Sequence, residues 1–279
     1  MIVALVLISA ALHACWNALV RLEPDKDAAV VAVVAIAWLF ALAVAAGEVA
    51  MGHAMFANGR AIAWACAAGL GETAYFFALA RALEAGPLAP MYTISRGGAV
   101  AIVWPLSIAF LGEAATAQGV AGTVVVLGGL AASGLERGLA RRAVAWAIAC
   151  ACCVAAYHLA YKLALDAGAA ESGTFALALA ISTAINVLRL GSARRAASLA
   201  RVKQAPLKMI AIGAVCAASF LVLMFGLRAG GAGLVLTLRN TSVLFATALA
   251  FAIGERPGAR AIAGAAIVAG GAILLTIGQ

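Results

Sequence analysis

Residues 112–129 read GEAATAQGVAGTVVVLGG, and residues 254–271, which follow 142 positions later, read GERPGARAIAGAAIVAGG. Eight of the 18 aligned positions are identical, and they include the opening Gly-Glu pair and the closing Gly-Gly pair. Alanine and glycine are abundant in this chain and inflate such matches, but composition does not explain two shared dipeptides at a single offset. The stretch therefore predicts an internal repeat with one copy in each half of the chain.

The sequence around this repeat is strongly apolar. Of 279 residues, 66% are hydrophobic and only 11% are charged, and the mean hydropathy is +1.09. A soluble domain is close to half apolar, so a soluble enzyme and a disordered tail are both excluded. A helix needs about 20 residues to cross a hydrocarbon core about 30 Å thick. Ten apolar runs of about this length occur, at residues 2–20, 28–51, 61–83, 88–111, 117–135, 143–163, 173–190, 208–229, 232–253 and 260–277.

The ten runs divide evenly between the two copies of the repeat. Five helices per copy is an odd number, so the second copy enters the membrane from the opposite side and the repeats are inverted. The predicted fold is an all-α polytopic membrane protein, with one five-helix repeat in residues 1–138 and a second in residues 139–279. The paired glycines of the fifth and tenth runs permit close helix packing, either within the chain or in a homodimer.

Several short motifs at the third to fifth runs resemble a known family. They are ALEAGPLA at residues 82–89, ISR at residues 94–96, and FLGE at residues 110–113 followed by Gln118. In this order and spacing they resemble the EamA-type members of the drug/metabolite transporter superfamily. The second half is similar to a less complete copy of the same pattern. The resemblance implies a ten-helix carrier of small metabolites or toxic compounds. It also implies a central cavity, lined mainly by helices 1, 3, 4, 6, 8 and 9.

Three charged residues lie deep inside apolar runs. Glu72 lies at the centre of the third run, and Arg96 and Arg239 lie about 10–12 Å inside the fourth and ninth runs. Such charges persist in a membrane only with a partner or with water. The functional interpretation is a cavity in which Glu72 titrates while the two arginines, with Tyr92 on the face of Arg96, hold an anionic group. The alternative is that the arginines reach to the interface and Glu72 is a structural counter-ion.

Two polar and aromatic stripes mark the first and sixth runs. His13, Trp16 and Asn17 follow helical spacing in the first run, and Tyr157 and His158 occupy the corresponding part of the sixth run. These faces are predicted to meet the cavity and contact the solute. The histidines are equally well explained as neutral core residues, and the aromatic residues as anchors at the membrane interface.

Proline and glutamate mark three further positions. Pro105, inside the fourth run, removes a backbone donor and is a candidate gating hinge. Glu113 and Glu255 each follow a glycine near the start of the last helix of a repeat, and capping of that helix is the expected role.

A secondary carrier is the function class that these features favour. The sequence has no nucleotide-binding loop G-x-x-x-x-G-K-[ST] and no H-E-x-x-H motif. A membrane-embedded enzyme acting on a lipid or isoprenoid substrate is the alternative, and a channel is a third possibility. No cofactor or metal is predicted, because the six cysteines lie in apolar runs where thiols behave as small hydrophobes. The expected partners are a small-molecule solute and membrane lipid. Export is the expected direction of transport if the solute is an amphipathic or anionic compound.

The distribution of cations predicts the orientation. The net charge of +8 is spread over short gaps and forms no basic domain that would hold nucleic acid. The loops after odd-numbered runs, counted with the run ends that flank them, hold 14 of the 19 Lys and Arg residues, whereas those after even-numbered runs hold 3. The positive-inside rule therefore places both termini on the outer face of a bacterial-type inner membrane. The family resemblance implies cytoplasmic termini instead.

Overall fold

The structure, a computed structural model, describes residues 2–111, 116–134, 138–229 and 232–277. The described residues form a bundle of helices, and their one β-type contact is an isolated antiparallel bridge between Phe56 and Ala169. The helices are α1 (Ile2–Arg21), α2 (Lys26–Ala50), α3 (Gly59–Ala85), α4 (Leu88–Leu111), α5 (Ala117–Gly134), α6 (Arg141–Asp166), α7 (Glu171–Arg189), α8 (Ser192–Gln204), α9 (Pro206–Ala229), α10 (Ala232–Arg239), α11 (Ser242–Ala252) and α12 (Ala259–Ile277).

Every predicted apolar run coincides with helix, but two features differ from the prediction. The ninth run is not one helix, because α10 ends at Arg239 and α11 begins at Ser242. At this break the backbone bonds shorten to three-residue spacing, as in the bond from the Thr241 N–H to the Leu238 carbonyl at 3.1 Å. The second difference is α8, a polar helix that the run count omits. Six helices, α1, α2, α3, α6, α7 and α9, are long and apolar enough to cross a membrane within the described chain.

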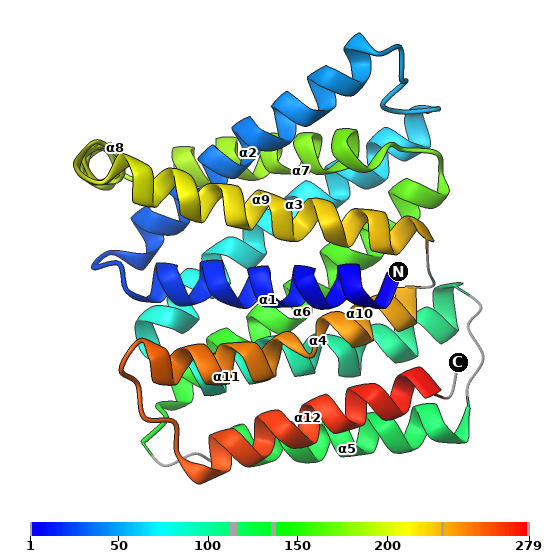
Figure 1. Cartoon of the computed structure of the whole chain (residues 1–279), viewed down its shortest axis with the longest axis vertical. Helices are drawn as coiled ribbons and strands as arrows, with labels where there is room; N and C mark the ends of the chain where they lie inside the picture. The colour runs from blue at the N-terminus through cyan, green and yellow to red at the C-terminus, as the bar shows by residue number, and fades with distance from the viewer. Residues whose placement is uncertain (1, 112–115, 135–137, 230–231, 278–279) are drawn as a thin grey trace.

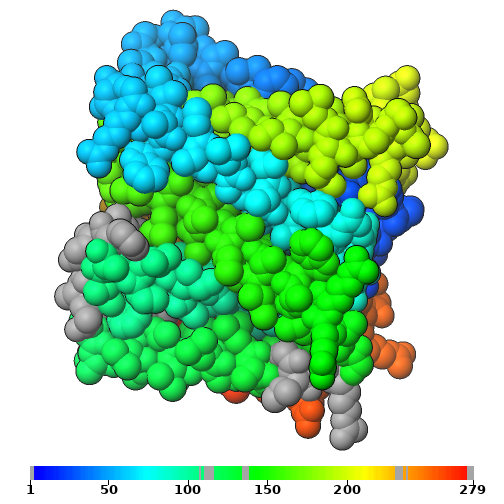
Figure 2. Space-filling model, turned by 180° about the vertical axis from the view of Figure 1, so that it is seen from behind, coloured from blue at the N-terminus to red at the C-terminus, as the bar shows by residue number. Residues whose placement is uncertain are grey.

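The two halves of the sequence are interleaved in space. The helix pairs with the most extensive packing are α3 with α6, α5 with α12, and α1 with α9, and each pair joins the first half to the second. Figure 2 shows α3 lying between α6 and α7 on the back of the molecule. The start of α1 and the end of α12 lie at one end of the bundle, and α8 lies across the other end (Figure 1).

The repeated glycines bring α5 and α12 into backbone contact. A Cβ atom placed on Gly129 would lie 2.8 Å from the Gly264 carbonyl oxygen, and one on Gly271 would lie 2.8 Å from the Val126 nitrogen. Neighbouring Gly128 has nothing within 4 Å of the same position. The glycine repeat therefore builds a close intramolecular interface, as small residues do between membrane helices.

We expect Gly129→Val to lower the free energy of unfolding by about 1–3 kcal/mol, because the new side chain meets backbone that has no room to move. Gly128→Val is the matched control, since the two substitutions change helix propensity equally and only the first meets a neighbour. Melting temperatures of both variants in detergent measure the difference. Equal melting temperatures would contradict the close contact.

A buried acid in the first turn of α2, Asp27, connects α8 to the rest of the bundle. Asp27, which is fully buried, accepts a bidentate pair from Arg189 and further contacts from Arg194 at 3.1 Å and Arg81 at 3.4 Å. The carboxylate thus joins α3, α7 and α8 to the first turn of α2.

A second buried acid, Glu23, connects α8 to the loop before α2 through an ion pair. Glu23 is buried and contacts Arg201 of α8 and Lys208 of α9, each at 2.5 Å. The hydrogen bond from Arg201, with a further contribution from Lys208, holds the pKa of the Glu23 carboxyl below its usual range. The Glu23 carboxyl is therefore ionised at neutral pH.

Glu255 does not have the expected role of capping its own helix. Its carboxylate pairs with Arg21 at the end of α1 at 2.8 Å and accepts the backbone N–H of Leu88, at the start of α4, at 2.8 Å. Because the first N–H groups of a helix have no partner within it, Glu255 caps α4 through this bond. Glu113 lies outside the described residues. Pro105 lies inside α4, which continues as helix from Leu88 to Leu111.

Candidate functional site

The polar stripe of α1 lies in the centre of the bundle. Ser9, His13, Trp16 and Asn17 are all fully buried. Trp16 donates its Nε1–H to the Nδ1 of His13 at 3.2 Å, and the two rings meet edge to face with centroids 5.3 Å apart. Asn17 donates to the His13 carbonyl at 2.7 Å. The stripe therefore faces the interior, with His13 at its middle.

Two arginines from different halves of the chain meet at this imidazole. The Nη2 of Arg96, on α4, contacts the Nε2 of His13, and the Nη2 of Arg239, at the end of α10, lies 2.8 Å from the Nδ1. Arg96 is 5% exposed and Arg239 is 2% exposed. Both guanidinium groups point into the bundle in this structure and not toward the interface. Arginines 143 positions apart in the sequence thus share one histidine.

This arrangement contains more hydrogen-bond donors than acceptors. A neutral imidazole offers one acceptor nitrogen, because the other nitrogen carries the proton. Here both ring nitrogens face guanidinium donors, and Trp16 adds a third donor to Nδ1. At least one of these three contacts lacks an acceptor whichever tautomer His13 adopts. The site is therefore short of acceptors.

The remaining contacts of the arginines do not supply a negative charge. Arg96 donates to the Tyr75 hydroxyl at 3.1 Å and lies over the rings of Tyr75 and Tyr92, 5.5 and 5.8 Å from their centroids. Arg239 donates to the Ser219 carbonyl at 2.9 Å and lies 5.1 Å from the centroid of Phe220. The Nε of Arg239 has no hydrogen-bond partner among the residues that the structure describes. No carboxylate lies within 4.0 Å of either guanidinium in the part of the chain that the structure describes.

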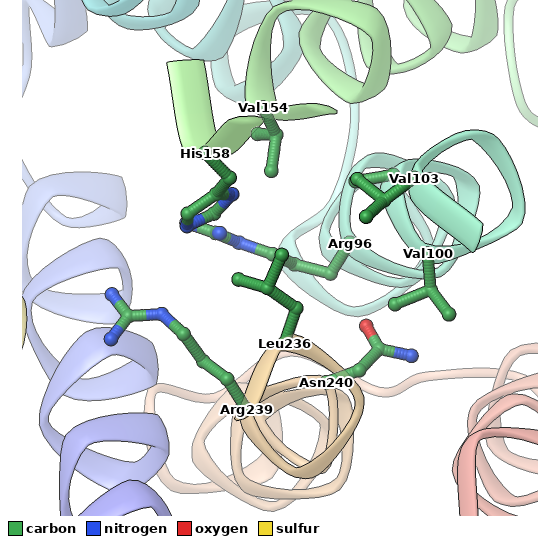
Figure 3. A pocket seen from close by; sticks show the side chains of 9 residues that line it. Arg96, Val100, Val103, Val154, His158, Leu236, Arg239 and Asn240 are labelled. Atoms are coloured by element: carbon green, nitrogen blue, oxygen red, sulfur yellow. The ribbon is translucent and has the colours of Figure 1, made fainter. Parts of the chain in front are cut away.

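A small cavity opens beside the two arginines (Figure 3). Its volume is about 20 Å³, enough for a water molecule but not for a metabolite. Arg96, His158, Arg239 and Asn240 form its polar wall, and Val100, Val103, Val154 and Leu236 contribute to its apolar wall. Both polar atoms of the Asn240 side chain are buried without a hydrogen-bond partner in the described ranges of the chain. The structure is therefore closed around an amphipathic space.

Glu72 lies apart from this cluster. It is fully buried on α3, and neither carboxylate oxygen has a hydrogen-bond partner within the described residues. The Tyr161 hydroxyl, on α6, is also buried and faces this carboxyl, but the two groups make no well-formed hydrogen bond in the described structure. An isolated carboxylate is very unfavourable in an apolar interior, so the neutral acid is the form that suits this environment. The structure brings the two predicted arginines together and does not bring Glu72 into contact with them.

The other predicted side chains surround the cluster. Tyr92 and His13 have ring centroids 6.2 Å apart. The ring centroids of Tyr157 and Tyr75 are 5.3 Å apart, and those of His158 and Tyr157 are 4.3 Å apart. The hydroxyls of Tyr92 and Tyr157 and the Nε2 of His158 are buried and make no well-formed hydrogen bond within the described residues. These groups line the region but leave their polar atoms unused.

The sequence did not predict the apolar lining of the cavity, nor four polar or aromatic residues that contact the arginines or line the cavity. They are Tyr75, Ser219, Phe220 and Asn240. Tyr75 follows Glu72 by one helical turn, and Asn240 belongs to the polar triplet Arg239-Asn240-Thr241 inside an apolar run. That triplet was the available signal for the helix break. Ser219 and Phe220 carried no signal, because single residues of these types are common in membrane helices.

Comparison with known proteins assigns the family. No curated protein matches the chain. Fifteen chains of solved structures match, and one, described only as the crystal structure of a protein, is 18% identical with a TM-score of 0.65, over 99% of this chain and 95% of that chain. This likeness shows a shared fold. The model of the EamA-like transporter family matches residues 141–277, nearly the whole second half. The chain is therefore a multi-pass membrane protein whose residues 141–277 belong to the EamA-like transporter family, within the drug/metabolite transporter superfamily.

Proposed function

We propose that the protein is a secondary carrier that exports a small anionic or amphipathic metabolite by alternating access. The observation that carries the proposal is the pair of buried arginines on His13, which have no carboxylate partner among the described residues. Burying two unpaired positive charges is unfavourable, and a bound anion offsets that penalty. A carboxylate between the guanidinium groups also supplies the acceptors that the imidazole cannot.

Each predicted site residue has a part in this proposal. Arg96 and Arg239 bind the anionic group, and His13 holds the two guanidinium groups apart. Trp16 and Asn17 fix the position of His13. The aromatic and imidazole groups that line the region contact the body of the solute, and they are Tyr92, Tyr157 and His158. Pro105 remains the proposed hinge of α4.

The proposed architecture is ten membrane spans in two inverted five-helix repeats, residues 1–138 and 139–279. In this arrangement α10 and α11 together form the ninth span, and α8 lies outside the membrane core. The positions of Arg96 and Arg239 support it, because equivalent residues of two inverted repeats approach a central site from opposite sides. The break between α10 and α11 at Asn240 is also typical of carrier sites, which use discontinuous helices.

We place the protein in a bacterial-type inner membrane with both termini outside. The end that holds α8 then faces the cytoplasm, as the cation count requires. A C-terminal reporter that is active only in the cytoplasm tests this orientation. Activity of that reporter would show that the C-terminus is cytoplasmic and that the proposed orientation is wrong.

Glu72 is the proposed coupling acid. We expect Glu72→Gln to remove the pH dependence of solute exchange between about pH 5 and pH 9, because glutamine mimics the neutral acid and cannot release a proton. Exchange rates of the variant and the wild type across this range measure the effect. Glu84→Gln is a matched control, since Glu84 is a partly exposed acid of the same helix that pairs with Arg81. Unchanged pH dependence in the Glu72 variant would make that residue structural.

Counterflow in proteoliposomes tests the function class. Vesicles loaded with an unlabelled carboxylate are expected to accumulate the labelled compound transiently and saturably. Amines and neutral solutes are expected to give no such signal. Ion conductance without saturation would indicate a channel, and conversion of added lipid or isoprenoid would indicate an enzyme.

A further inference from the structure

The polar helix α8 has the features of a helix that lies on a membrane surface. It runs across the end of the bundle, at a large angle to the neighbouring helices α2 and α9 (Figure 1). Its 13 residues contain four cations and no acid, and Ser198 is the one buried residue among them. Leu188 and Leu207, which flank α8 in the sequence, are 72% and 82% exposed. Basic helices flanked by exposed leucines suit the boundary between headgroups and acyl chains.

The cations of α8 fall into two groups. Arg194 contacts Asp25 and Asp27, and Arg201 contacts Glu23, so these two cations hold the helix on the bundle. Arg195 has no ion pair with any described carboxylate, and its Nε donates to the Leu190 carbonyl at 2.7 Å. This bond fixes the stem of Arg195 and leaves its terminal nitrogens available. Its positive charge is not neutralised by the described part of the protein.

An apolar groove begins beside Arg195. It lies between α2, α7 and α8 and has a volume of about 220 Å³. Arg195 is its one charged residue, and its apolar lining includes Val31, Ala35, Ile36, Leu199 and Val202. The site thus combines one cation with a hydrocarbon-lined groove at the level of the membrane surface.

We propose that this groove binds an anionic phospholipid, with the phosphate on Arg195 and one acyl chain between α2 and α8. Charge complementarity identifies the occupant, because α8, which borders the groove, carries four cations and no acid. A neutral lipid would leave the Arg195 charge unmatched, and a free anion would leave the groove empty. The proposal goes beyond the carrier function and does not depend on the solute that is carried.

Lipid retention tests the proposal directly. The full chain is reconstituted in nanodiscs with equal parts of phosphatidylglycerol and phosphatidylcholine, extracted in mild detergent, and examined by native mass spectrometry. The wild type is expected to retain phosphatidylglycerol in preference to phosphatidylcholine. Arg195→Ala is expected to lower that retention about fivefold, the effect of one cation at an anionic surface. Arg195→Lys keeps the charge and is expected to retain most of the lipid.

Two further variants separate the headgroup from the chain. Ala35→Phe fills the groove without changing charge and is expected to lower phosphatidylglycerol retention as Arg195→Ala does. Arg256→Ala removes an exposed cation in the loop between α11 and α12, away from the groove, and is expected to retain lipid as the wild type does. Melting temperatures show that each variant is folded. Equal loss in the Arg256 variant, or wild-type retention in both groove variants, would overturn the proposal.

Discussion

Replacing Arg239 with alanine is expected to lower carboxylate counterflow at least about 100-fold. The substitution removes charge-assisted hydrogen bonds, each of which contributes about 1.5–3 kcal/mol when the acceptor is ionised. It also leaves Arg96 as the one guanidinium at His13. We expect the same order of loss for Arg96→Ala, because the two residues occupy equivalent positions on the imidazole. Initial rates over a range of solute concentrations measure the effect.

Conservative and peripheral variants make this result interpretable. Lysine at position 239 keeps the charge but lacks the planar fork, so partial activity is expected. Arg142→Ala removes an exposed arginine at the start of α6 and is expected to transport as the wild type does. Normal exchange by folded Arg96→Ala and Arg239→Ala proteins would show that the cluster is structural.

Replacing Asp27 with asparagine is expected to lower the free energy of unfolding by about 3–5 kcal/mol, the typical effect of breaking a buried ion pair. The buried carboxylate faces Arg81, Arg189 and Arg194, and asparagine leaves these three cations facing one another. The loss is expected to release α8, because Asp27 links it to α2. Unfolding in mixed detergent micelles measures stability, and hydrogen exchange of the α8 amides measures the release.

Asp25→Asn is the matched control for Asp27→Asn. Asp25 is more exposed, lies 3.7 Å from Arg194, and accepts the N–H of Ala28 as the cap of α2. Asparagine is an equally good cap, so a change below about 1 kcal/mol is expected. Equal stability of the two variants would mean that the Asp27 cluster does not hold α8.

The sequence predicts the helices of this protein well, for a physical reason. Crossing a membrane requires long apolar helices, so their positions are visible as runs of residues. The buried stripe of His13 and Trp16 was predictable from helical spacing alone. That Arg96 and Arg239 approach one place was expected from the proposed repeat, because equivalent positions of two inverted halves would converge near the centre.

The sequence did not predict features that depend on tertiary contacts. The break at Asn240 lies inside a long apolar run, where the short polar triplet at residues 239–241 was its one local signal, and α8 is too short and polar to count as a span. Glu255 reaches Arg21 and Leu88, which lie more than 160 positions away in the sequence, so local helix rules pointed to the wrong partner. The separation of Glu72 from the arginines was equally hidden, because depth along a helix does not fix the direction of a side chain.

The most direct measurement compares one solute as its carboxylate and as its carboxamide, in counterflow by the wild-type protein. The two compounds have nearly the same shape and differ in charge, so the comparison isolates what Arg96 and Arg239 recognise. If the two arginines bind the carboxylate, we expect saturable exchange of the carboxylate compound. Exchange of the carboxamide is expected to be at least about 100-fold slower, because the amide leaves both buried guanidinium groups without a negative partner. Equal exchange of the two compounds would contradict it.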